Sequence, residues 1–86
     1  MTFAVVWSVV ASVDFASMLA NADDPARIRE AAARIDFMLR RMARDLGESR
    51  GLGYRLWYED VLGVFYSIDE DAMRVEVLFA GPSRRH

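Results

Sequence analysis

The chain has 86 residues and a mass of 9.8 kDa, a size that allows one domain with a modest core. It has no cysteine, which excludes disulfide bonds and thiolate metal ligands, and its 53% hydrophobic content excludes a disordered chain. Eleven basic residues, all of them arginine, stand against 13 acidic ones, and the net charge is −2. Such a chain has no overall attraction for a polyanion, so nucleic-acid binding would need a local basic cluster.

The chain begins with an apolar segment. Residues 3–10 are mostly β-branched or aromatic and, apart from Ser8, apolar on both faces, which predicts a strand covered on each side. The same run resembles a signal-peptide core in length, but no Lys or Arg precedes it and Asp14 ends it short of a membrane span. We expect a strand here, followed by a helix over residues 13–22 with Ser12 as its N-cap. We also expect a cytoplasmic protein without metal or cofactor, since the lack of cysteine fits a reducing compartment.

The clearest pattern in the chain is a long amphipathic helix over residues 26–46. Asp24 is a suitable N-cap, Pro25 fits the first helical position, and Gly47 fits the position that follows a helix. Apolar residues recur at steps of three and four and form one stripe: Ile28, Ala31, Ala32, Ile35, Leu39, Met42 and Leu46.

The period changes to two after Gly53. Alternating segments cover residues 52–59, 62–68 and 72–80, and short acidic turns separate them, which predicts an antiparallel meander. The element order is then β-α-α-β-β-β. We expect an α+β fold in which a helical hairpin packs on one face of a mainly antiparallel four-stranded sheet.

The alternation also divides the sheet residues into two faces. If the helices cover the face that carries Tyr54 and Leu56, then Trp57, Phe65 and Leu78 lie on the uncovered face. An exposed apolar patch with two aromatic rings is expected at a protein interface. The patch would receive a partner segment or a second copy of the chain, or be covered by the C-terminal tail or a loop.

Residues 47–80 resemble the RelE/ParE superfamily of small toxins from bacterial toxin–antitoxin pairs. The likeness lies in a glycine-led loop, a strand carrying Arg55, a strand that ends in Tyr66-Ser67-Ile68-Asp69, and a last strand after an acidic turn. The resemblance implies a growth-inhibiting toxin that a cognate antitoxin protein neutralises. One branch of the family cleaves mRNA on the ribosome without a metal ion, and another acts on DNA gyrase without nuclease chemistry.

Metal-free RNA cleavage needs a base, an acid and cations that stabilise the charged transition state. Arg55 matches the family's arginine on the second strand, and Glu48 lies where some members place a general base. Residues Arg84, Arg85 and His86 follow the last strand, where the family often carries polar active-site residues. The resemblance therefore implies these five residues as catalytic candidates.

Each candidate also has a structural interpretation. Arg55 fits a solvated residue on the helix-free face, Glu48 a surface pair with Arg50, and the last three residues a plain basic tail. The sequence departs from active nucleases at Gly63-Val64, where these usually present another arginine, and it has no lysine. Three alternatives stay open. The first is an mRNA-cleaving toxin, and the second is a non-enzymatic member that acts by protein interaction, for example on gyrase, or a degenerate copy without toxicity. The third is an unrelated α+β module that dimerises through the aromatic sheet face.

Overall fold

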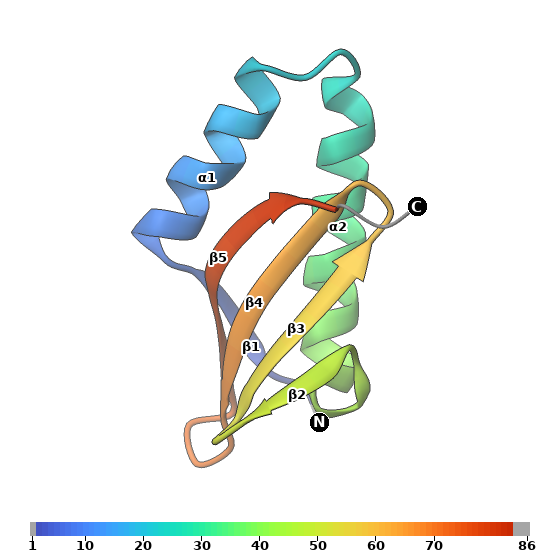
Figure 1. Ribbon diagram of the computed structural model, residues 1–86. Coiled ribbons are helices and arrows are strands. Elements are labelled where there is room, and N and C mark those ends of the chain that lie inside the picture. The colour runs from blue at the N-terminus through green and yellow to red at the C-terminus, as the bar shows by residue number, and fades with distance from the viewer. Residues whose placement is uncertain (1, 84–86) are drawn as a thin grey trace.

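A computed structural model describes residues 2–83, in which two helices pack against one face of a five-stranded sheet (Figure 1). In chain order the elements are β1 (Ala4–Trp7), α1 (Val9–Ala20), α2 (Pro25–Met42), the 3₁₀ turn η1 (Ala43–Asp45), β2 (Glu48–Gly51), β3 (Tyr54–Glu59), β4 (Leu62–Asp69) and β5 (Arg74–Pro82). The strand order is β1-β5-β4-β3-β2. Only the β1–β5 pair is parallel, and the other neighbours are antiparallel.

The expected α+β fold with a helical hairpin on one sheet face is confirmed, but the sheet has five strands rather than four. The additional strand is β2, which pairs with β3 at the edge of the sheet. Its sequence, Glu-Ser-Arg-Gly, contains no β-branched or aromatic residue, so its composition gives no strand signal. Its pairing comes from the tight turn between β2 and β3.

The N-terminal strand is shorter than predicted and the first helix begins earlier. Ser8, rather than Ser12, is the N-cap of α1: its Oγ accepts the Ala11 N–H and donates to the Leu78 carbonyl, both at 3.0 Å. A run that is apolar on every side has no period that separates strand from helix. The boundary is therefore set by the contact of Ser8 with β5, far along the chain.

The long amphipathic helix is present as predicted at its N-terminus. Asp24 accepts the Arg27 N–H at 3.2 Å, and the buried side chains of α2 include Ile28, Ala31, Ile35 and Leu39. The α-helix ends at Met42 and one 3₁₀ turn follows. Gly47 has a φ of +64°, and a Cβ at this position would overlap the Leu56 carbonyl, so only glycine fits the close approach of this turn to β3.

The core lies between the helices and the central strands β4 and β5. Its fully buried sheet residues are Leu62, Val64, Tyr66, Val75 and Val77. Beyond Val77, where β1 no longer pairs with β5, α1 flanks the strand and the Asp14 carboxylate accepts the Ala80 N–H at 3.2 Å. Within residues 2–83, neither helix has the length and apolar character needed to cross a membrane.

Candidate functional site

The helices cover the face of β3 that the sequence analysis assigned to solvent. Arg55 pairs across strands with Tyr66, and Trp57 with Val64, so all four residues share the buried face. Trp57 packs against the core, and its prediction as an exposed interface residue is wrong. The charged residues Arg55 and Glu59 made this face of β3 resemble a solvent-exposed face. Both side chains instead form hydrogen bonds at the edges of the covered face: Glu59, for example, accepts a hydrogen bond from Nε of Arg34 in α2 at 2.9 Å.

The opposite face, which we call the open face, carries a strip of apolar side chains. Leu56, Phe65 and Phe79 lie opposite one another on three adjacent strands, and Tyr54 stacks on Phe65 with ring centroids 5.6 Å apart. The Phe65 and Phe79 centroids are 6.1 Å apart, and 54% of Phe79 is exposed. We call Tyr54, Leu56, Phe65 and Phe79 the aromatic strip.

Leu78 does not take the position predicted for it. The register of β5 against β4 shifts between Phe65 and Tyr66, so that Phe79 faces Phe65 while Val77 faces Tyr66. Leu78 is the extra residue of this bulge and is only half-buried. The bulge therefore brings Phe79 to the open face in the place that simple alternation assigned to Leu78.

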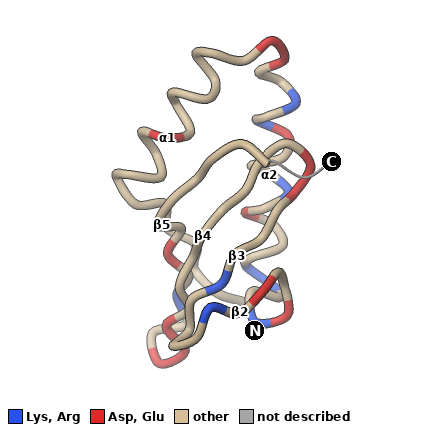
Figure 2. Tube along the Cα trace, viewed as in Figure 1, with Lys and Arg blue, Asp and Glu red and all other residues tan. Residues whose placement is uncertain are grey.

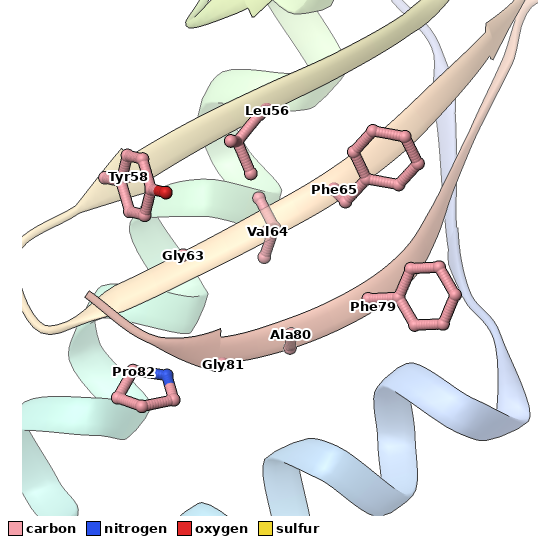
Figure 3. Close-up of a pocket in the computed structure, with 9 residues that line it drawn as sticks. All are labelled: Leu56, Tyr58, Gly63, Val64, Phe65, Phe79, Ala80, Gly81 and Pro82. Atoms are coloured by element: carbon pink, nitrogen blue, oxygen red, sulfur yellow. The ribbon is translucent and has the colours of Figure 1, made fainter. Parts of the chain in front are cut away.

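A shallow groove of about 230 Å³ continues from the aromatic strip toward the β3–β4 turn (Figure 3). The Tyr58 ring lies over Gly63, where an added Cβ would be 2.8 Å from two ring carbons. A Cβ at Gly81 would meet no atom within 4 Å. Gly81 and Pro82 thus leave open space at the end of β5, and the groove can take a side chain from outside.

Arg55 is held by backbone carbonyls and lies away from the aromatic strip. Its Nε donates to the Leu46 carbonyl at 2.6 Å, and its Nη2 donates to Gly47 at 3.2 Å. The buried Tyr66 hydroxyl donates to Ala43 at 2.7 Å and also lies 3.2 Å from the Leu46 carbonyl. Burial raises the pKa of Tyr66 to about 12. The hydrogen bonds of Arg55 and Tyr66 thus hold the segment between α2 and β2 against the sheet.

The remaining catalytic candidates are not brought together with Arg55. Glu48 is exposed on the edge strand β2, with its Oε1 3.6 Å from Nη2 of Arg50. Arg84, Arg85 and His86 lie outside the described residues. The last described residue, Ser83, donates its N–H to the Val61 carbonyl at 2.8 Å, next to Pro82 at the end of the groove.

Charge is concentrated away from the middle of the sheet (Figure 2). Residues 62–68 of β4 and 77–83 at the end of the described chain include no charged side chain. Four arginines bind acids near the helices: Arg27 pairs with Asp60, Arg34 with Glu59, Arg40 with Asp36, and Arg44 with Glu70. The aromatic strip itself offers apolar contact area and ring faces, and no cation.

No protein-family model and no curated protein sequence matches the chain. Its structure is similar to a chain of the toxin–antitoxin complex RelBE2 from Mycobacterium tuberculosis, with a TM-score of 0.78 and 21% identity over 96% of this chain and 100% of that one. It is also similar to a chain of the chromosomal ParDE system from P. aeruginosa, with a TM-score of 0.71 and 11% identity over 95% and 97% of the two chains. The chain has the RelE/ParE fold.

Within this RelE/ParE fold, the residues that sequence reasoning missed are those of the strip other than Phe65. Tyr54 and Leu56 were expected on the covered face, and simple alternation over residues 72–80 would put Phe79 on the same face as the buried Val75 and Val77. The acidic turn at residues 69–71 did not indicate the position of Phe79, because Phe65 precedes that turn by four residues and Phe79 follows it by eight. The two rings face each other because the observed turn spans residues 70–73 and the bulge at Leu78 adds one residue to β5.

Proposed function

We propose that the chain is the toxin component of a toxin–antitoxin pair in the bacterial cytoplasm and binds its cognate antitoxin through the open face. The fold supports this proposal, because both similar structures come from toxin–antitoxin assemblies. The observation that carries it is the exposed aromatic strip. Clustered aromatic side chains around a groove are typical of the centre of a protein interface.

The same geometry favours growth inhibition by protein interaction over RNA cleavage. A phosphorane-like transition state needs cations directed at its oxygens, whereas Arg55 donates to backbone carbonyls on the covered face. Glu48 lies on the edge strand β2 opposite Leu56 of the strip, and the cation beside it, Arg50, lies 3.6 Å from its own Oε1 rather than being directed at a substrate position. We therefore infer a non-enzymatic toxin that binds a protein target, with DNA gyrase as the target class that the ParE-like resemblance implies.

One observation keeps mRNA cleavage as a second candidate. Pro82 lines the groove, and the basic residues Arg84 and Arg85 and the sole histidine, His86, follow it within four positions of the sequence. A histidine is the side chain best suited to acid–base work near neutral pH. The two candidates differ in what they do to transcripts, which makes them separable by one experiment.

The test is inducible expression of the full chain in a bacterial host, with and without the protein encoded next to it. The proposal predicts growth arrest that coexpression of the neighbouring protein relieves, with transcripts left intact. Cleaved transcripts in an arrested culture would favour the second candidate instead, and unimpaired growth would contradict both. Measurement of plasmid supercoiling in the arrested culture tests the gyrase assignment.

A further inference from the structure

The turn between β2 and β3 holds a leucine in an unusual position. Leu52 is 98% exposed, more than any other large hydrophobic residue described as exposed. It has a φ of +55°, and its neighbours Gly51 and Gly53 have φ values of +85° and +83°. Three consecutive residues thus adopt the left-handed conformation, and the middle one carries a branched apolar side chain.

Neither backbone nor core explains a leucine at this position. The left-handed region suits glycine and, next, asparagine, because a Cβ crowds the following carbonyl. A side chain that stays almost fully in water gains nothing from burial. Strained and exposed apolar residues that contribute nothing to the fold point to a contact outside it.

The turn itself is fixed to the sheet. The Gly53 carbonyl accepts the Ile68 N–H at 2.9 Å, and the Gly51 N–H donates to Ser49 Oγ at 3.2 Å. The turn between β2 and β3, which Figure 1 shows at one end of the sheet, therefore presents Leu52 at a defined place. Tyr58, which lines the groove, lies toward the other end of β3. A preorganised tip loses little conformational freedom when it binds.

The surroundings of the tip fit a protein partner rather than a nucleic acid. Ile68, which pairs with the tip, leads directly into the acidic turn at residues 69–71. In this turn the Glu70 carboxylate binds Arg44, while Asp69 accepts the Ala72 N–H. The charges around the tip are of both signs, because Arg44 binds Glu70, Arg74 lies opposite Asp69, and Arg50 lies 3.6 Å from Glu48. These charges balance one another and do not attract a polyanion.

We propose that Leu52 is the anchor by which the chain engages the protein target of its growth inhibition, inserting into an apolar pocket. This inference rests on the proposed function as a toxin. It adds a second contact, because the aromatic strip and groove receive the antitoxin, while Leu52, in the turn beside the Tyr54 end of the strip, contacts the target. Loss of such a buried anchor weakens an interface by about 30-fold or more.

The experiment compares the wild-type chain with Leu52→Asn and with Val9→Asn as a matched control. Val9 is 81% exposed on α1, so its replacement removes a largely exposed aliphatic side chain away from the tip. For each full-length protein we would measure growth arrest on induction, the midpoint of thermal unfolding, and binding to the protein encoded next to it. Leu52→Asn is expected to unfold at the wild-type temperature or above, to bind the neighbouring protein normally, and to lose growth arrest. Val9→Asn is expected to keep all three properties.

Three results would overturn the inference. Undiminished growth arrest by Leu52→Asn would remove Leu52 from the target contact, and a lowered unfolding midpoint would assign it a structural role. Loss of binding to the neighbouring protein would place it in the antitoxin site instead. If the wild-type chain arrests nothing, the proposed function fails first, which distinguishes that failure from the failure of the Leu52 assignment.

Discussion

The Tyr66 hydroxyl donates a hydrogen bond to the Ala43 carbonyl at 2.7 Å and so ties the central strand to the end of the long helix. Because Tyr66 is fully buried, water cannot replace the hydroxyl if it is removed. We expect Tyr66→Phe to lower the free energy of unfolding by about 1–2 kcal/mol. Urea denaturation measures the change. Tyr54→Phe, at a partly exposed ring on the open face, is the control and should change stability by less than about 0.5 kcal/mol.

Because the pKa of Tyr66 is raised, both the stability of the protein and its tyrosinate absorbance should show a specific change at alkaline pH. Burial holds this phenol protonated to a pKa of about 12, above its usual value near 10. In the unfolded chain the Tyr66 phenol ionises at a lower pH, near its usual pKa of about 10. The contribution of Tyr66 to the free energy of unfolding is therefore complete below pH 10 and decreases as the pH rises from 10 toward 12. Ultraviolet titration of tyrosinate should show one phenol that ionises last, and Tyr66→Phe should remove that phase. Persistence of the late phase in Tyr66→Phe would refute the assignment.

The two glycines of the groove should respond oppositely to substitution. Gly63→Ala would force a methyl group to 2.8 Å from the Tyr58 ring, and we expect a loss of about 1–3 kcal/mol in the free energy of unfolding. Gly81→Ala meets open space and should leave stability nearly unchanged. A larger residue, Gly81→Val, should fill the groove and weaken antitoxin binding without loss of fold. Normal binding by a well-folded Gly81→Val protein would show that the groove is not occupied in the complex.

The ion pair between Arg27 and Asp60 predicts how stability changes in acid. Arg27 donates to both carboxylate oxygens of Asp60, at 2.6 and 2.7 Å, and these bonds lower the pKa of Asp60. A carboxyl with a lowered folded pKa stabilises the native state at neutral pH, and that contribution disappears as the pH falls through the folded pKa. Asp60→Asn should therefore show a smaller decrease in its urea midpoint between pH 7 and pH 3 than the wild type. Equal decreases in the two proteins would mean that the pair does not contribute.

The sequence predicted the elements better than it predicted the faces. The long helix follows from its apolar stripe, and the meander from alternation and acidic turns, because both patterns are local. The covered face of β3 depends instead on where Arg55 and Glu59 find partners, at the Leu46 carbonyl and at Arg34, which lie far from them in sequence. The position of Phe79 depends on a bulge that shifts the phase of β5 by one residue. Neither a tertiary ion pair nor a bulge can be recognised from the periodicity of a single strand.

Antitoxin binding by the open face can be tested directly, because the chain contains a matched pair of exposed phenylalanines. Phe79 on the open face and Phe37 on α2 are both 54% exposed, so Phe79→Ser and Phe37→Ser remove the same side chain at the same exposure. The most direct measurement is isothermal titration of each variant with the protein encoded next to the chain. If the open face binds the antitoxin, Phe79→Ser weakens binding by about 30-fold or more while Phe37→Ser binds like the wild type. Unchanged binding by Phe79→Ser, with weakened binding by Phe37→Ser, would instead place the antitoxin interface on the helices and refute binding through the open face.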